Sequence, residues 1–314
     1  RQRHLTIPCE MCIRDRLSVI GRFKSPIPVS IEAPAGCGLF TGRLIRGVTN
    51  GPSPRWLQDR LKSIGLKPRS ALVDITNYIN FDRGRPLHAY DATQLTGTVT
   101  ARYGRSGESF IDLTGREVAV GPEMVVIADD KGVLGLGGII GGLDSACSES
   151  TSTVFLESAL FDPTHIFRAG RDTGINTDAR YRLERSVAPG FVWPGLELAT
   201  RKILEMCGGE ASEAVSAGQA PALPAPVLFD PDHTRRLAGM AVSLPRTRAI
   251  LKALGCDAVP EGGASKALRV TPPSFRPDLR HPTDLVEEIA RIEGFDKLPA
   301  PTPRHARLRH IYTT

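Results

Sequence analysis

The chain has 314 residues, of which 41% are hydrophobic and 24% charged, an ordinary composition for a globular protein. Its formal net charge of +6 suits a polyanionic partner, but so small an excess is common in proteins that bind no nucleic acid. No run of about 18 apolar residues is present, which excludes a membrane span and makes a cytoplasmic protein our expectation.

The six cysteines indicate neither a disulfide framework nor a metal site. Only Cys9 and Cys12 stand close together, as Cys-x-x-Cys, and no second Cys pair or Cys/His pair follows at zinc spacing. The sequence around them does not supply the strand and helix of a redox motif. We therefore expect reduced cysteines.

The first half of the chain mixes helix and strand signals. Residues 1–30 show little periodicity and stay unassigned, as foreign or disordered sequence. Ser53-Pro54 followed by Leu57, Leu61 and Ile64 predicts a helix that Gly65 ends. We expect short strands where β-type runs lie between turn residues, at residues 71–75, 98–103, 108–113, 124–128 and 153–157.

The second half is richer in helix. We expect helices at residues 163–171 and 193–207, and a turn into a charged helix at residues 176–185. Residues 213–226 are rich in Ala, Ser, Gly and Pro and predict a linker. Beyond it, we expect a smaller unit over residues 227–300, followed by a disordered tail at residues 301–314. The predicted elements of this smaller unit are helices at residues 230–238, 245–254 and 283–292 and a strand at residues 268–271.

Several polar positions stand out, each with a structural alternative. Thr76, Asn77 and His88 flank a Gly-x-Pro turn, although a lone histidine is more often a satisfied structural residue. Glu157 closes an apolar strand, where an ionised carboxylate is costly unless it is paired or used, although a strand-end glutamate facing solvent is the commoner case. The glycine-dense segment 135–142 lacks the spacing of a phosphate-binding loop; it predicts tight packing or close approach of backbone to a ligand.

Four carboxylates gather in the second unit, at Asp278, Asp284, Glu287 and Glu288. The last three share one face of the predicted helix, and oxygen ligands of this kind suit Mg²⁺. An acidic helix start with salt bridges to Arg280 or Arg291 explains the same pattern equally well.

Taken in order, these motifs resemble the beta subunit of bacterial phenylalanyl-tRNA synthetase over about residues 31–299. The resemblance rests on Ser53-Pro-Arg-Trp-Leu-Gln, Val73-Asp-Ile-Thr-Asn-Tyr78, Gly84-Arg-Pro-Leu-His-Ala-Tyr-Asp91, Gly137-Gly-Ile-Ile-Gly-Gly142, Phe155-Leu-Glu-Ser158, Gly174-Ile-Asn-Thr-Asp-Ala179 and Ser274-Phe-Arg-Pro-Asp278.

The resemblance implies an α+β fold with two domains. A mixed α/β editing domain would span residues 31–212, and a smaller α+β domain with a DNA-binding-like fold would span residues 227–300. The family's editing domain hydrolyses tyrosine wrongly attached to the phenylalanine tRNA. A hydrophobic synthetic pocket rejects an added hydroxyl only by about 10², so a second site must select for that hydroxyl.

The resemblance also implies roles for single residues. Glu157 would accept the tyrosine phenol, and Gly141, Thr177 and Ala179 would bound the substrate pocket. Thr76, Asn77 and His88 would orient the attacking water and the terminal ribose. Asp278, Asp284, Glu287 and Glu288 fall on the family's magnesium positions.

Two departures concern a single turn, because Ser186 and Ala188 stand where the family usually has Gly and Asp. In the family, ATP is used at the alpha subunit, and two alpha chains assemble with two beta chains. We therefore expect this chain to support phenylalanyl-tRNA aminoacylation in such an assembly and to carry only the editing activity. The alternatives are a non-catalytic tRNA-binding and assembly module with a vestigial pocket, and a stand-alone nucleic-acid-binding protein, against which the scattered charges argue.

Overall fold

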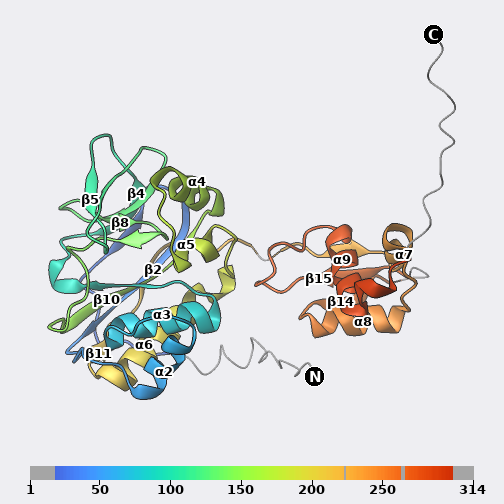
Figure 1. Cartoon of the computed structure of the whole chain (residues 1–314), viewed down its shortest axis with the longest axis horizontal. Helices are drawn as coiled ribbons and strands as arrows, with labels where there is room; N and C mark the ends of the chain where they lie inside the picture. Colours follow the sequence, from blue (N-terminus) through green and yellow to red (C-terminus); the bar gives the residue numbers. More distant parts are fainter. Residues whose placement is uncertain (1–17, 223, 263–265, 300–314) are drawn as a thin grey trace, which may run out of the picture. The chain divides into compact units, whose positions relative to one another are not determined.

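The computed structural model describes residues 18–222, 224–262 and 266–299, which form two compact units divided between Pro221 and Ala222 (Figure 1). The Cys-x-x-Cys motif and the expected tail at residues 301–314 lie outside the described residues. Residues 18–30, which we left unassigned, belong to the first unit. Each unit is described by itself below.

The first unit is organised around an antiparallel sheet. Its two long central strands, β2 (Cys37–Arg46) and β10 (Thr153–Phe161), pair along almost their whole length. Three shorter strands flank this pair, β3 (His88–Asp91) beside β10, and β11 (Glu210–Ala211) and β12 (Val215–Gly218) beside β2.

A second sheet covers one face of the first. Its strand order is β1 (Val29–Ile31), β4 (Val99–Tyr103), β7 (Val125–Ala128), β8 (Val133–Leu136) and β9 (Ile140–Gly141). Only the pairing of β1 with β4 is parallel. A small ribbon, β5 (Ser109–Ile111) and β6 (Glu117–Ala119), lies beside this sheet.

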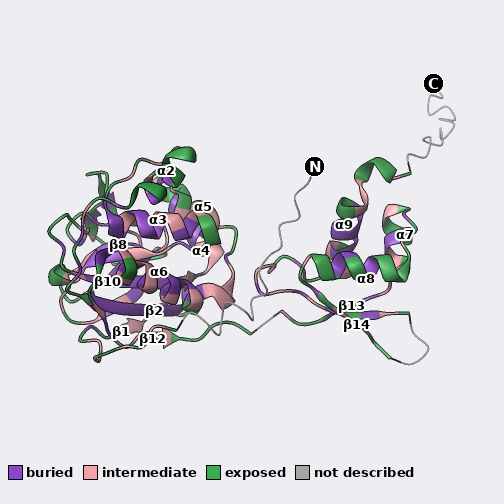
Figure 2. Ribbon diagram, turned by 90° about the horizontal axis from the view of Figure 1, so that it is seen from below, coloured by how far each residue is buried: buried purple, intermediate pink, exposed green. Residues whose placement is uncertain are grey.

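Helices cover the opposite face of the first sheet, where α2 (Arg55–Ser63), α3 (Ala71–Arg83) and α6 (Val192–Cys207) lie together (Figure 1). The strands at the centre are buried between these two layers (Figure 2). The shorter helices α4 (Pro163–Thr173) and α5 (Asp178–Leu183) follow β10, and 3-10 turns occur at Ala92–Gln94 and Pro189–Phe191.

Side-chain alternation along β10 divides the first unit into two cores. Val154 and Leu156 pack with α2, α3 and α6, whereas Phe155 and Ala159 pack with the second sheet. Glu157 lies two residues after Phe155, so the two side chains point to the same face of the sheet. The Glu157 carboxylate therefore lies between the two sheets.

The prediction of a strand at residues 71–75 was wrong, because this segment is the first part of α3. Its short apolar run also fits a buried helix, and residues 71, 72, 75, 76 and 79 repeat with helical spacing on the buried side. Asp74 fixes the start: its carboxylate accepts hydrogen bonds from Ser53 Oγ and from the Arg69 amide. The remaining predicted helices and strands of this unit are confirmed, with ends shifted by a few residues.

The expected linker at residues 213–226 contains a strand. Residues 215–218 form β12, which pairs with β2 through Val215 opposite Gly42 and Gly218 opposite Leu39. The Ala/Ser/Gly composition that suggests a linker also suits a short edge strand, since small side chains leave little apolar surface exposed.

Ser186 has a φ of 71°, and among the described residues it is the only non-glycine with a positive φ. The resemblance drawn from the sequence implies glycine at this position, and glycine adopts that conformation without strain. The departure noted in the sequence therefore leaves the turn in its left-handed conformation, held by a residue less suited to it.

The second unit packs three helices with a three-stranded antiparallel sheet in the order β13 (Val227–Phe229), β15 (Leu268–Thr271) and β14 (Asp257–Pro260). The helices are α7 (Asp232–Ala238), α8 (Leu244–Ala253) and α9 (Pro282–Glu293), followed by a 3-10 turn at Phe295–Lys297. The three predicted helices and one predicted strand are confirmed, and two strands were missed. The expected α+β fold class is confirmed.

Within the described residues, no helix combines the length and the hydropathy needed to cross a membrane.

One buried ion pair joins the first sheet to its helical layer. Arg43 of β2 is 3% exposed and donates two hydrogen bonds to the Glu197 carboxylate of α6, at 2.9 Å and 2.7 Å. The same carboxylate accepts a hydrogen bond from the Val19 amide at 2.6 Å. The pair thus ties the sheet, α6 and the segment before β1 together.

We expect Arg43→Met to lower the free energy of unfolding by roughly 3 kcal/mol, because it leaves the Glu197 carboxylate largely buried without its cation. Urea unfolding measures this change. The matched control is Arg46→Met on the same strand, whose pair with Glu210 is exposed and should contribute less than about 1 kcal/mol. Equal losses from the two variants would contradict this role for Arg43.

Candidate active site

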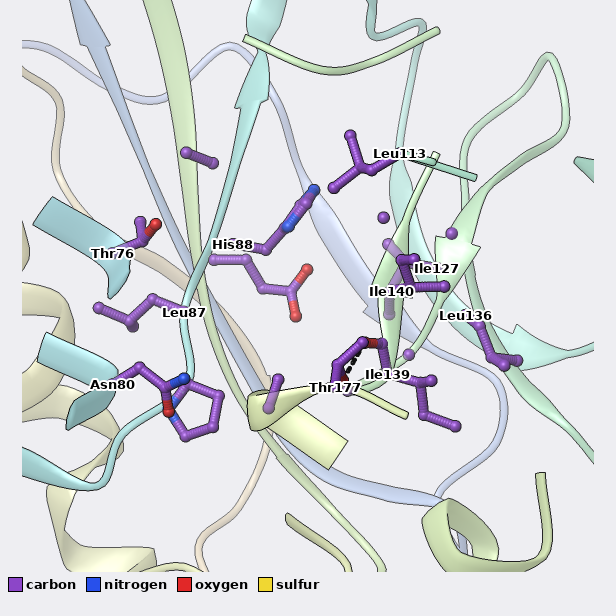
Figure 3. Close-up of a pocket in the computed structure, with 18 of the residues that line it drawn as sticks. Thr76, Asn80, Leu87, His88, Leu113, Ile127, Leu136, Ile139, Ile140 and Thr177 are labelled. Carbon is purple, nitrogen blue, oxygen red and sulfur yellow. Dashed lines mark hydrogen bonds between the residues drawn. The ribbon is translucent and has the colours of Figure 1, made fainter. Parts of the chain in front are cut away.

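A cavity of about 650 Å³ lies in the first unit, lined by residues of both sheets, of α3 and of α5. Seven of the site residues predicted from the sequence line it, namely Thr76, Asn77, His88, Gly141, Glu157, Thr177 and Ala179. Figure 3 shows His88 in the middle of the lining residues, with Thr76 and Asn80 on one side and Leu113, Ile127 and Ile140 on the other. The structure therefore brings these seven together, while their individual roles stay predictions.

Glu157 sits at the centre of the first sheet, opposite His88 on β3 and opposite Gly42 on β2. It is 6% exposed, and burial raises the pKa of its carboxyl to about 7 although a hydrogen bond from Tyr90 lowers it. Near neutral pH this carboxyl is therefore divided between its charged and neutral forms.

Glycine 42 leaves room for the neighbouring aromatic ring. A Cβ atom at this position would lie 2.2 Å from Cζ of Phe155, so the Phe155 ring lies over the Gly42 backbone. The Phe155 ring adds to the apolar surroundings of Glu157, which lies two residues further along β10.

His88 is a neutral histidine, since burial lowers its pKa to about 4. Its Nε2 atom is buried and has no hydrogen-bond partner among the described residues. The ring lies against Gly141 of β9, where a Cβ atom would come within 2.3 Å of the histidine Cε1. The Nε2 nitrogen is thus, within the described residues, an unsatisfied buried polar atom of an uncharged ring.

Arg85 holds the segment that leads into β3. It is 1% exposed, and its guanidinium donates hydrogen bonds to the carbonyls of Ala159 and Ala188. Burial lowers its pKa to about 10, so it stays charged near neutral pH. This anchoring fixes the position of His88 three residues later.

One wall of the cavity comes from α3. Thr76, Asn77 and Asn80 line it, and Thr76 Oγ1 donates to the Val73 carbonyl of its own helix at 2.8 Å. Asn80 was not among the predicted residues; its Oδ1 atom is buried and unpartnered among the described residues. Arg69, just before the helix, is an exposed cation at the same cavity.

The opposite wall comes from the start of α5. Thr177 caps this helix, because its Oγ1 accepts a hydrogen bond from the Arg180 amide, and it donates to the Ile139 carbonyl at 2.8 Å (Figure 3). This second bond ties α5 to the turn before β9. Ala179, two residues on, presents only a methyl group to the cavity.

The acidic residues of the second unit are already paired. Arg276 donates to both oxygens of Asp278 and, at 2.9 Å, to Oε1 of Glu288, whose Oε2 is paired with Arg291. These hydrogen bonds from Arg276 lower the pKa of both carboxyls. Asp284 instead caps α9, accepting from the Arg280 and His281 amides.

These four carboxylates do not converge on a point in the way that metal ligands do. Glu287 is exposed whereas Glu288 is buried, and in the described residues no group of three or more His, Cys, Asp or Glu side chains is arranged to hold a metal ion. The arrangement matches the salt-bridged helix start that we weighed as the alternative, and the magnesium site stays a prediction from the sequence.

Comparison with known proteins matches both units to named families. The B3/4 domain family matches residues 36–208, and the tRNA synthetase B5 domain family matches residues 227–295. The chain is 50% identical over 308 residues to a phenylalanine–tRNA ligase beta subunit of Rhodospirillum rubrum, covering 96% of this chain and 38% of the relative. It is 50% identical over 300 residues to that of Paramagnetospirillum magneticum, covering 94% of this chain and 37% of the relative.

The chain belongs to the phenylalanine–tRNA ligase beta-subunit family. It spans rather more than a third of the length of these relatives. A crystal structure of an N-terminal fragment of the phenylalanyl-tRNA synthetase beta subunit from Pyrococcus horikoshii is also similar, at 16% identity and a TM-score of 0.40, covering 87% of this chain and 76% of that one. The recognition made from the sequence is confirmed.

Reasoning from the sequence missed many of the lining residues, among them the polar residues Tyr90 and Asn80. Asn80 lies one turn after Thr76 and Asn77, but reading residues 71–75 as a strand concealed that shared helical face. Tyr90 lies two residues after His88, so the strand period of two would have placed both on one face.

We expect Gly141→Ala to lower the free energy of unfolding by roughly 1–3 kcal/mol, because its Cβ would overlap the His88 ring. Urea unfolding tests this, with Gly121→Ala as control, where the nearest atom to a new Cβ is Cε of Met124 at 3.8 Å. If both variants are as stable as the parent, the contact between β9 and His88 is looser than described here.

The paired carboxylates of α9 predict no specific effect of magnesium on the second unit. The melting temperature in MgCl₂ should equal that in NaCl of the same ionic strength, both in the parent chain and in Glu288→Gln. A rise that only MgCl₂ produces, and that Glu288→Gln removes, would contradict this and support the metal site that the resemblance implies.

Proposed function

We propose that this chain is the part of a phenylalanine–tRNA ligase beta subunit that hydrolyses tyrosine mistakenly esterified to the phenylalanine tRNA, and that it supports phenylalanyl-tRNA aminoacylation in this way. The observation that carries the proposal is the buried carboxylate of Glu157 in a cavity whose other lining is largely apolar. Such a site favours a ligand with an aromatic body and a hydrogen-bond donor at its tip.

Selectivity would come from the hydroxyl that distinguishes tyrosine from phenylalanine. A phenol donates a charge-assisted hydrogen bond to an ionised carboxylate, whereas phenylalanine leaves one oxygen of that buried carboxylate without a partner. Sites that demand a hydroxyl discriminate far more strongly than apolar pockets that merely tolerate its absence. A second site of this kind corrects the error that an apolar synthetic pocket makes.

Hydrolysis would use neutral groups around the ester. The unpartnered Nε2 of His88 can accept a hydrogen bond from water, and a pKa of about 4 keeps the ring uncharged at neutral pH. Asn77, Thr76 and the unpartnered Asn80 Oδ1 on α3 supply hydrogen-bonding groups for the terminal ribose. The ester itself needs only an oriented water molecule, so we assign no general base to His88.

Arg69 would contact the nucleic acid rather than the amino acid. It is exposed, and among the described residues that line the cavity it is the only arginine or lysine. Phosphate contacts from arginine position a nucleic acid without reading its sequence. A tRNA acceptor end would thus enter beside the start of α3.

The remaining proposals concern the whole protein. The names of the relatives denote the beta subunit of a ligase, and we infer that this chain functions in the cytoplasm with alpha subunits, in an assembly of two alpha and two beta chains. ATP would be used at the alpha subunit. Mg²⁺ would serve the complete enzyme, and we derive no step of the hydrolysis through it.

We expect Glu157→Gln to lower the preference for tyrosyl-tRNA over phenylalanyl-tRNA by roughly 10- to 100-fold in kcat/KM, because a charged acceptor is replaced by a neutral one. Deacylation of both substrates by the parent and the variant measures this. In the parent the preference should rise as the pH increases through about 7, since Glu157 ionises there, and in the variant it should not change.

The control for this experiment is Glu108→Gln, which removes the carboxylate that pairs with Arg102 outside the cavity. The control variant should keep the preference of the parent. If Glu157→Gln keeps full selectivity, Glu157 does not read the hydroxyl. If the parent chain deacylates neither substrate, the reading as a binding and assembly module is supported instead.

A further inference from the structure

A phenol from the protein itself already binds Glu157. Tyr90 Oη donates a hydrogen bond to Glu157 Oε2 at 2.6 Å, and the two residues are 2% and 6% exposed. They lie on the adjacent strands β3 and β10, diagonally across the pair, because Tyr90 is in register with Phe155 and Glu157 with His88. The other carboxylate oxygen, Oε1, has no hydrogen-bond partner among the described residues.

The Tyr90 ring is held on several sides. It meets the His88 ring edge-on, with centroids 4.4 Å apart, and lies 6.4 Å from the Phe155 ring. Its backbone is bridged to β10 on one side and to Ala146 on the other. Because the ring is fixed in this way, the Tyr90 hydroxyl is held toward Oε2 of Glu157.

We propose that Tyr90 is a positioning and specificity-determining residue of this cavity: its hydroxyl occupies Oε2 and orients the carboxylate so that Oε1 receives the phenol of the bound tyrosyl group. The inference rests on the proposed function for the identity of that ligand. The geometry of the Tyr90 contact stands without it.

Few other groups bear on the charge of Glu157. His88 from β3 is neutral, and Cys37 from β2 is a buried thiol whose pKa burial raises above its usual range. Gly42 on β2 and Gly141, Thr177 and Ala179 on the far wall bring no charge, while Asp178 is exposed and paired with Arg182. Tyr90 is therefore the one side chain that donates a hydrogen bond to this carboxylate in the described residues.

The consequence is a dependence of the Glu157 charge on Tyr90. Burial favours the neutral form of Glu157, whereas the hydrogen bond from Tyr90 favours the charged form. Tyr90 itself stays protonated, because burial and the nearby Glu157 carboxylate raise its pKa well above the ordinary value. Removing its hydroxyl should therefore raise the pKa of Glu157.

The test is binding of tyrosinamide and phenylalaninamide by the 314-residue chain across a range of pH, in the parent and in Tyr90→Phe. The variant keeps the ring and its packing. We expect the pH at which tyrosinamide becomes preferred to rise by about one unit, and the preference at neutral pH to fall roughly fivefold. Tyr103→Phe, which removes a phenol outside the cavity, should leave both unchanged.

An unshifted pH profile in Tyr90→Phe would overturn the proposal. If that variant does not fold, the parent can carry 3-fluorotyrosine at its five tyrosines, which makes the phenol a stronger donor and should shift the profile to lower pH. No shift there would overturn the proposal equally.

Failure of the proposed function gives a different result. A parent chain that prefers tyrosinamide but does not deacylate tyrosyl-tRNA would contradict the editing activity and leave the role of Tyr90 intact. A parent chain with no preference for tyrosinamide at any pH would contradict both.

Discussion

The carboxylate of Glu157 is buried between two sheets, and the first unit is built around that constraint. Because burial raises its pKa from 4.5 to about 7, the folded protein keeps the proton that the unfolded chain loses. The free energy of unfolding therefore falls as the pH rises through this interval. A charge that lowers stability at neutral pH is expected at a binding site rather than in a structural core.

Glycines around Glu157 leave space for the aromatic rings that pack there. Gly42 lets the Phe155 ring lie over β2, and Gly141 lets β9 approach the His88 ring. Arg85 fixes the segment that delivers His88, and Thr177 fixes the helix that faces it. The glycine-dense segment packs tightly, as one of our two explanations expects, and it lines the cavity. Close approach of its backbone to a ligand stays a prediction.

Features set by residues close together in the sequence could be predicted, whereas contacts between residues far apart in the sequence could not. Local signals placed most of the helices but only a minority of the strands, and they missed the long central strand β2. The resemblance named seven residues that line one cavity. Helix α3 was missed because a short apolar run fits a strand as well as a helix, and Asp74 stabilises the helix through Ser53, 21 residues away. The pairing of Tyr90 with Glu157, and of Arg276 with Glu288, depends on strand register and rotamers that no local pattern contains.

The most direct test of this account is the pKa of Glu157 itself, measured by NMR of a ¹³C-labelled carboxyl group. The account predicts a pKa near 7 in the free chain, a decrease when tyrosinamide binds, and no decrease with phenylalaninamide. A pKa near the ordinary value of 4.5, or a value that neither ligand changes, would show that this carboxyl does not bind the phenol as described.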